Sequence, residues 1–204
     1  MVYSFKHLSI SMPYPIAHIM FFVLCISAVM IYAVLGAFSR KELSRKDYMH
    51  VLLLLFVGGG GALLPDIMAA YGILTGGSLQ HCTIGPVSTH SLLFSSSAIL
   101  FGMFVGYVAY RNSGKAVYMG IFAGSAFISH LLLDDLARYE MDYFYPFYQP
   151  VSIFSYLDSE VARTDFLYYE LASYAFVLSI FFVIMIALFA LSHLGFEFRY
   201  KSGK

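Results

Sequence analysis

Residues 116–137, AVYMGIFAGSAFISHLLLDDLA, decide how this chain folds. A spanning helix needs about 20 apolar residues, and this stretch is long enough although it carries His130 and Asp134. A charged side chain near the middle of a membrane helix costs about 2.5–3.5 kcal/mol, so its presence implies a partner. The two residues are one helical turn apart and share a helix face, where they can bind one ion or two neighbouring ions. The stretch therefore predicts a membrane helix that carries two metal ligands.

Four further apolar stretches flank this one, so the sequence predicts about five transmembrane helices. Their expected bounds are 16–38, 49–72, 91–110, 116–137 and 167–194. Hydrophobic residues make up 60% of the chain and charged residues only 12%, whereas a soluble domain has about 25% charged residues. We therefore expect an all-α, polytopic membrane helical bundle, with residues 1–204 forming one domain in the cell membrane.

The distribution of Lys and Arg predicts the orientation, because both accumulate on the cytoplasmic face of a membrane. Most of them fall on one side of the predicted bundle, namely Arg40, Lys41, Arg45, Lys46, Arg111, Lys115, Arg199, Lys201 and Lys204. The other side has Lys6, Arg138 and Arg163. We expect the N-terminus outside, the C-terminus in the cytoplasm and an extracytoplasmic aromatic loop at 138–166. The net charge is zero and no basic tract occurs, which argues against a nucleic-acid-binding protein.

Five His and Asp side chains are predicted to meet in the outer half of the membrane. They are His18, Asp66, His90, His130 and Asp134. At about 1.5 Å per helical residue, all five come out about 20–30 Å from the cytoplasmic ends of their spans. His90 follows Thr89, a candidate helix N-cap, and Asp66 follows Pro65, so both are expected at helix ends where a cavity can open. The predicted site of this protein therefore faces the extracytoplasmic side.

The ligand types indicate which metal would bind. Imidazole and carboxylate suit zinc, and ligand type alone leaves Mn²⁺ and Fe²⁺ open as alternatives. The two carboxylates balance the charge of one divalent cation. Three histidines and two aspartates exceed the four ligands of a closed structural zinc site. This surplus favours two or more ions, or an open catalytic position, and we expect one to three Zn²⁺ ions.

Each predicted ligand also has a structural alternative. An intramembrane histidine such as His18 can simply hydrogen-bond to a neighbouring helix. His130 and Asp134 can form a histidine–carboxylate pair without a metal. Asp66 can be a residue that terminates a helix.

Three more polar residues lie close to the predicted ligands in the sequence. Asp135 points about 100° away from Asp134 on a helix and is either a solvated neighbour or a proton acceptor beside the ligands. Arg138 either holds a substrate phosphate or anchors its helix at the membrane boundary. His81 is either a further ligand or a loop residue without a role. The aromatic residues that follow Arg138 form either an interfacial belt or a lid for a lipid substrate.

The motifs resemble those of the YdjM-like family of inner-membrane, predicted metal-dependent hydrolases. The resemblance lies in an early histidine, Leu-Leu-Pro-Asp66, Thr-His90-Ser, His130-Leu-Leu-Leu-Asp134 and the Tyr145-Pro146-Phe147 element. The family is thought to be distantly similar to the zinc-dependent phospholipase C and zinc-nuclease superfamily. That relation implies one metal site at Asp66, His90, His130 and Asp134, with Asp134 bridging toward a second ion near His18. The chain departs from the family's His-Arg-Gly-x-Thr-His run, because a longer segment without arginine separates His81 from His90.

The function predicted from these features is the metal-dependent hydrolysis of a phosphoester in a lipid or lipid-linked substrate at the outer leaflet. Metal ions would activate a water molecule, and Asp66, Asp134 or Asp135 would take its proton. An ion or proton transporter with a His/Asp relay is the alternative, although spans one, two and four offer few polar residues on the cytoplasmic side of the cluster. The third hypothesis is a structural protein in which a bound metal ion only stabilises the helical bundle.

Overall fold

The computed structural model describes residues 15–75, 83–136, 141–153 and 166–198. Most of these residues are helical, which confirms the predicted fold class in its coarse form. The helices are α1 (Pro15–Met20), η1 (Phe21–Ile26), α2 (Ala28–Ser39), α3 (Arg45–Leu63), η2 (Leu64–Asp66), α4 (Ile67–Thr75), α5 (Ser95–Tyr110), α6 (Ser113–Leu136) and α8 (Phe166–His193). An antiparallel hairpin of β1 (Thr83–Ile84) and β2 (Val87–Ser88) lies between α4 and α5.

Several helices are apolar enough to cross a membrane. Within the described ranges, three helical stretches are also long enough, namely Arg45–Asp66, Ser113–Leu136 and Leu171–His193. The broken helix formed by Ile16–Ile26 and Ala28–Ser39, which is bent by 65°, is a fourth candidate. These stretches correspond to four of the five predicted spans.

The remaining predicted span, 91–110, is shorter in the structure than expected. α5 has 16 residues and begins only after a turn. The Ser91 hydroxyl stabilises this turn, since it donates to Ser88 O at 2.9 Å and accepts from Phe94 N at 3.1 Å. Thr89 therefore does not cap α5 as predicted, and His90 lies on irregular backbone before the helix.

The first apolar stretch is not a continuous α-helix. Residues 21–26 widen into the π-helix η1, and Ser27 N donates to Phe22 O at 3.0 Å where η1 ends. Short π-helical segments of this kind occur often at functional sites. The resulting bend separates α1, which carries His18, from α2.

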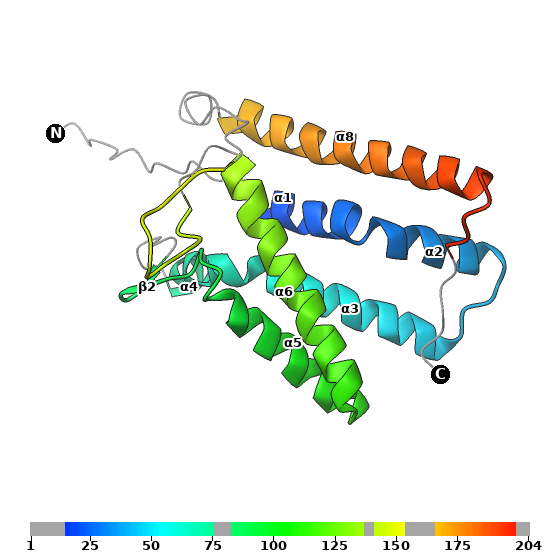
Figure 1. Cartoon of the computed structure of the whole chain (residues 1–204), viewed down its shortest axis with the longest axis horizontal. Helices are drawn as coiled ribbons and strands as arrows, with labels where there is room; N and C mark the ends of the chain where they lie inside the picture. Colours follow the sequence, from blue (N-terminus) through cyan, green and yellow to red (C-terminus); the bar gives the residue numbers. More distant parts are fainter. Residues whose placement is uncertain (1–14, 76–82, 137–140, 154–165, 199–204) are drawn as a thin grey trace.

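Glycines allow α3 and α5 to lie very close to α6, which is central in Figure 1. A Cβ atom at Gly61 of α3 would lie 2.5 Å from the carbonyl oxygen of Ala123 in α6. A Cβ atom at Gly102 of α5 would collide with the carbonyl oxygen of Met119, which also lies in α6. Only a residue without a side chain permits such an approach. α6 is therefore held between two partner helices along much of its length.

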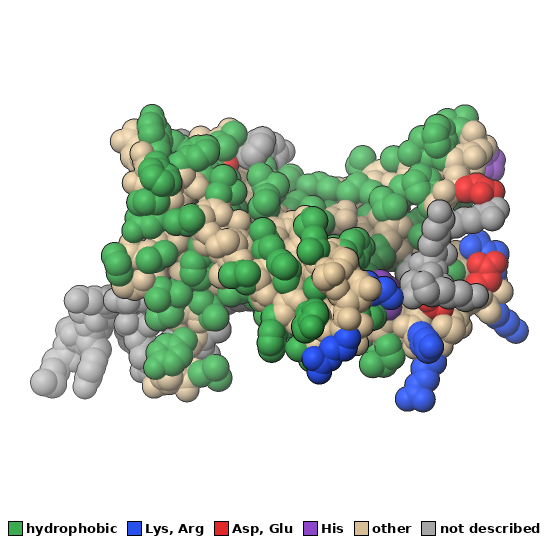
Figure 2. Space-filling view, turned by 60° about the horizontal axis from the view of Figure 1, so that its bottom comes forward, with side chains coloured by type: hydrophobic (Ala, Val, Ile, Leu, Met, Phe, Trp, Pro, Cys, Tyr) green, Lys and Arg blue, Asp and Glu red, His purple; other side chains and the backbone are tan. Residues whose placement is uncertain are grey.

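α8 lies along α1 and α2 (Figure 1). Val177 of α8 is buried in this contact, and its carbonyl oxygen is 3.5 Å from Cys25 Sγ. Apolar side chains cover the middle of the molecule in the view of Figure 2. Blue Lys and Arg side chains gather toward the end where α2 finishes and α3 begins. Basic side chains of the described residues are thus concentrated toward this end.

The segment 141–153 is attached to the opposite region, near the end of α6. Its two arms are joined by an antiparallel bridge, in which Met141 N donates to Val151 O at 2.9 Å and Val151 N donates to Met141 O at 3.0 Å. Leu92 N donates to Tyr143 O at 3.0 Å, which connects the segment to the turn before α5. Several of its aromatic side chains are exposed, namely Phe144, Phe147 and Tyr148.

Candidate metal centre

Five buried side chains from four parts of the chain meet beside α6. They are His18 in α1, Asp66 in η2, His90 before α5, and His130 and Asp134 in α6. Each exposes 7% or less of its surface. The structure thus brings together all five residues that the sequence singled out as ligands, and their binding of a metal stays a prediction.

Asp134 lies at the centre of this cluster. Its Oδ1 atom is 3.2 Å from His18 Nε2. Its Oδ2 atom is 3.3 Å from His90 Nε2 and 3.1 Å from His130 Nε2. The carboxylate is completely buried, and the described part of the chain provides no Lys or Arg that pairs with it. Histidines therefore surround a buried negative charge.

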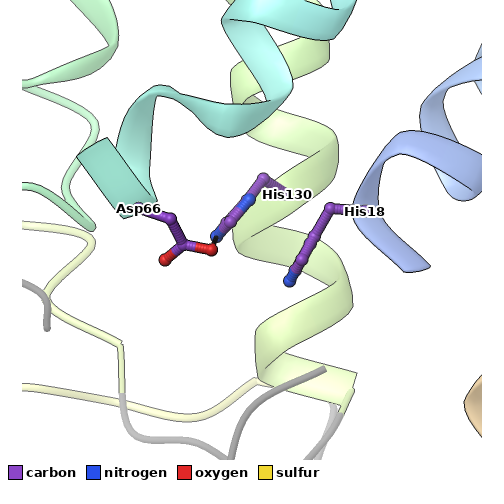
Figure 3. Close-up of side chains that lie close together, drawn as sticks. All are labelled: His18, Asp66 and His130. Carbon is purple, nitrogen blue, oxygen red and sulfur yellow. Dashed lines mark ion pairs between the residues drawn. The ribbon is translucent and has the colours of Figure 1, made fainter. Parts of the chain in front are cut away.

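Pro65 places Asp66 in the cluster. Proline lacks a backbone N–H and clashes with the carbonyl four residues earlier, so α3 stops and the chain tightens into η2. Asp66 Oδ1 is then 3.5 Å from His90 Nε2, and Oδ2 is 3.8 Å from His130 Nε2. Figure 3 shows Asp66, His130 and His18 approaching one another from η2, α6 and α1.

Two histidines have their second ring nitrogen occupied. His130 Nδ1 is 2.6 Å from the carbonyl oxygen of Ala62, and His90 Nδ1 is 3.1 Å from Thr89 Oγ1. A carbonyl oxygen only accepts, so His130 Nδ1 carries the proton and the Nε2 of the neutral ring keeps its lone pair. Metal-binding histidines almost always make such a second hydrogen bond, which fixes the ring and its tautomer. Both rings turn Nε2 toward the cluster.

The imidazole nitrogens and carboxylate oxygens that face the centre of the cluster lie close together but do not form hydrogen bonds with one another. Among the described residues, neither His18 Nε2, His130 Nε2 nor either oxygen of Asp134 has a hydrogen-bond partner. In the neutral form, His130 Nε2 and Asp134 Oδ2 are both acceptors, and two acceptors 3.1 Å apart need a cation between them. This arrangement fits a metal ion, with a proton on His130 as the alternative.

Ring stacking argues against protonation of several histidines at once. The His18 and His130 rings are stacked, with centroids 3.6 Å apart and an angle of 12° between their planes. Two imidazolium ions at this separation would repel each other strongly in a buried site. Neutral imidazoles that each bind a metal ion through Nε2 avoid this repulsion.

The described residues contain two groups of three that could hold an ion. They are His18, Asp66 and His130, and His90, His130 and Asp134, with the ligand atoms of each group within 4.8 Å of one another. His130 occurs in both groups, but its Nδ1 is committed to Ala62 and its Nε2 can bind only one ion. Imidazole and carboxylate ligands suit zinc, manganese or iron. The cluster could therefore hold a metal ion of this kind.

Asp135 is buried beside the cluster but faces the segment 141–153. Its Oδ2 accepts from Tyr143 Oη at 2.9 Å, and its Oδ1 accepts from Ser152 Oγ at 2.6 Å and Ile153 N at 2.9 Å. Burial, together with the bond to Asp135, raises the pKa of Tyr143, so its hydroxyl stays protonated and donates. The catalytic role of Asp135 stays a prediction, and its oxygens are engaged by these donors.

Two predicted residues, Arg138 and His81, lie outside the described residues. Two contributors to the site were not predicted at all. Ala62 acts through its backbone carbonyl, which a side-chain pattern does not reveal. Tyr143 was one of many aromatic residues in the predicted loop, and only its burial distinguishes it from its exposed neighbours.

Comparison with known proteins identifies the family. No curated protein and no solved structure matches this chain significantly. The family model described as "YdjM inner membrane protein" matches residues 16–197. This match covers nearly the whole chain and includes all five residues of the cluster. The chain therefore belongs to the YdjM inner membrane protein family.

Proposed function

We propose that this protein is a membrane-embedded, metal-dependent hydrolase that cleaves a phosphoester bond in a lipid or lipid-linked substrate. The observation that carries the proposal is the contact between His130 Nε2 and Asp134 Oδ2, two buried atoms 3.1 Å apart without hydrogen-bond geometry. Membership of an inner-membrane family supports a substrate that is reached from the lipid phase. The hydrolytic reaction is inferred from the ligand set and from the distant relation that we expect between this family and the zinc-dependent phospholipase C superfamily.

Zinc is the ion that we propose, with one to three ions bound. Asp66, His90, His130 and Asp134 would hold one of them, and His18 with Asp134 Oδ1 would reach a second. When bound, such ions lower the pKa of water toward neutrality and stabilise the charge that develops on phosphoryl oxygens. Five candidate ligands exceed the four of a closed structural site, which leaves a position for water or substrate.

Asp66 is the carboxylate that we propose as proton acceptor. It exposes 7% of its surface, whereas Asp134 and Asp135 are completely buried. The oxygens of Asp134 lie 3.1–3.3 Å from imidazole nitrogens, whereas those of Asp66 lie 3.5 and 3.8 Å from them. Both oxygens of Asp135 accept hydrogen bonds from the segment 141–153. Arg138 remains our proposed contact for the substrate phosphate.

We also propose five membrane spans, with the N-terminus outside and the C-terminus in the cytoplasm. α5, together with the turn that precedes it, would be the third of these spans in chain order. The basic residues between α2 and α3 then lie in the cytoplasm (Figure 2), as the excess of Lys and Arg on that face requires. The histidine and aspartate cluster lies far from this end of the bundle, near the outer leaflet.

The first experiment measures metal and activity on the same preparations. Purified protein is analysed by mass spectrometry for metal. It is then incubated with phospholipid vesicles, for which the released phosphorylated head group is measured, and with a polyprenyl diphosphate, for which released diphosphate and phosphate are measured. We expect stoichiometric zinc and hydrolysis in the wild type, and loss of both in His130→Ala. His50→Ala is the matched control, because His50 lies toward the end where basic side chains are concentrated and contacts Tyr110 instead. It should keep the metal and the activity.

Each other outcome has a defined meaning. Wild-type protein that contains no metal after reloading with zinc would overturn the proposal. Metal without hydrolysis of any substrate would support the structural alternative. Proton or cation flux into vesicles that depends on His130 would support the transporter alternative.

Reporter fusions test the proposed orientation. A reporter that is active only in the cytoplasm should be active after Lys204 and inactive when inserted at Gly85, in the turn between β1 and β2. The reverse pattern would overturn the orientation. Equal activity at both positions would mean an even number of spans between Gly85 and Lys204 and would overturn the proposed five-span topology.

A further inference from the structure

His90 differs from the other candidate ligands because no regular helix or strand positions it. His18, Asp66, His130 and Asp134 lie in helices, whereas His90 lies in the irregular stretch between β2 and α5. Its ring must nevertheless keep Nε2 3.3 Å from Asp134 Oδ2. The contacts that fix the backbone near His90 therefore decide whether this ligand is in place.

One of these contacts leads back to α6. Leu92, two residues after His90, donates its backbone N–H to Tyr143 O at 3.0 Å. The Tyr143 side chain is buried, and its hydroxyl lies 2.9 Å from Asp135 Oδ2 and 3.3 Å from Leu131 O. Tyr143 thus connects the backbone beside His90 to α6, the helix that carries His130 and Asp134.

Asp135 binds the Tyr143 hydroxyl and also holds the rest of the segment 141–153 against α6. It is completely buried in α6, and besides Tyr143 it accepts hydrogen bonds from Ser152 Oγ and Ile153 N. Hydrogen bonds from several donors are what a buried carboxylate needs to remain charged. Because these donors come from the segment 141–153, Asp135 fixes that segment to α6 at the level of Asp134.

We propose that Tyr143 and Asp135 form a clamp that positions the metal ligand His90 against Asp134. The clamp runs from Asp135 through the Tyr143 hydroxyl and carbonyl to Leu92. Both are positioning residues, since neither side chain points into the cluster. This inference rests on the proposed metal site and assigns a role to residues that the proposed reaction does not use.

The test measures zinc affinity by competition with a chelator. Tyr143→Phe removes only the hydroxyl, and we expect it to weaken zinc binding about 10-fold, at the low end of the effect of residues that support metal ligands. Asp135→Asn cannot satisfy all its donors and should have a similar effect. The double variant should bind zinc no more weakly than either single variant, because both substitutions break the same connection. Asp135→Asn also serves as the second variant if Tyr143→Phe does not fold.

A matched control comes from the same segment. Tyr145→Phe also removes a hydroxyl, one that donates to Pro86 O at 2.6 Å in the β1–β2 turn, and not to Asp135. It should bind zinc within twofold of the wild type. A loss of affinity equal to that of Tyr143→Phe would show a general loosening of the segment and would overturn the clamp.

The decisive comparison uses the His90→Ala background. If Tyr143 acts through His90, Tyr143→Phe should not weaken zinc binding further once His90 is absent. The cobalt-loaded Tyr143→Phe protein should also show the absorption spectrum of cobalt-loaded His90→Ala. An equal loss of affinity in both backgrounds would overturn the clamp. Wild-type affinity in Tyr143→Phe would overturn the clamp alone, whereas a wild type without metal would overturn the proposed function and the clamp together.

Discussion

The Nδ1 atom of His130 lies 2.6 Å from the carbonyl oxygen of Ala62, which joins α6 to α3 inside the cluster. This contact orients the ring and determines which nitrogen faces Asp134. It exists because Gly61, next to Ala62, lets α3 approach α6 so closely that a Cβ would lie 2.5 Å from Ala123 O. Helix packing and ligand geometry therefore depend on the same pair of helices.

Replacement of Gly61 by Ala should separate these helices. The added methyl group meets backbone atoms of Ala123, which cannot rotate away. We expect the free energy of unfolding to fall by about 1–3 kcal/mol, as for other overpacked sites. Zinc affinity should fall as well, because the His130 ring loses its acceptor at Ala62. Thermal unfolding in detergent and a chelator competition assay measure the two effects.

Gly59→Ala is the control for this prediction. Gly59 lies in the same helix, and a Cβ there would have no neighbour within 4 Å. It should not lower the unfolding temperature, because alanine is at least as favourable as glycine inside a helix, and it should leave the zinc affinity unchanged. Gly61→Ala protein with wild-type stability and affinity would show that the close approach of α3 and α6 is not needed.

Replacement of Asp134 by Asn should remove the metal while keeping the fold. Asn has nearly the same size but no charge, and Asp134 lies within 3.3 Å of three imidazole nitrogens. We expect zinc to drop to background and the metal-free variant to be at least as stable as metal-free wild type, because a buried charge has been removed. Metal analysis and thermal unfolding test this. Asp142→Asn, in the segment 141–153, should retain the zinc.

Removal of the metal should destabilise the wild type. A ligand that binds only the folded state stabilises it, by about 4 kcal/mol at 1,000 times its Kd. A strong chelator should therefore lower the unfolding temperature, and zinc should restore it. The same treatment should not affect Asp134→Asn. An unchanged unfolding temperature in the wild type would argue against a metal bound in the native state.

Much of the cluster could be predicted from the sequence because its residues are costly in a membrane. His130 and Asp134 share a helix face by spacing alone, and Asp66 and His90 stand out as polar residues at the ends of apolar stretches. The convergence of these residues follows from the expected topology. A membrane environment thus makes functional polar residues easier to recognise than they are in a soluble domain.

The contacts that support the cluster could not be predicted in the same way. The turn before α5 depends on Ser91 hydrogen bonds that compete with helical ones, a local choice that spacing does not reveal. Asp135 follows Asp134 directly and has the same chemistry, yet it binds the segment 141–153. The distinction comes from long-range packing, which places Tyr143 against Asp135 and three histidines against Asp134.

Pro65 lies in the 3₁₀-helix η2, which follows α3 and sets the direction of the Asp66 side chain. An α-helix turns about 100° per residue and a 3₁₀-helix about 120°. Over the three residues of η2, this difference rotates Asp66 by roughly 60° relative to a continuous α-helix. Pro65→Ala allows the α-helical hydrogen bonds to continue, so we expect the Asp66 carboxylate to turn away from His90 and His130. Zinc affinity should fall at least 10-fold while the unfolding temperature of the metal-free protein stays the same or rises.

The Asp66→Asn background distinguishes this effect from a general disturbance of the cluster. Pro65 is expected to act only through the direction of Asp66, so Pro65→Ala should cause no further loss of zinc affinity once that carboxylate is absent. Chelator competition on the single and double variants measures the difference. A further loss in the double variant would mean that the proline supports other ligands, and wild-type affinity in Pro65→Ala would mean that η2 forms without it. We expect Pro65→Ala protein to bind zinc more weakly while its metal-free form is no less stable than the metal-free wild type. This result would show that Pro65 supports metal binding and does not stabilise the helix.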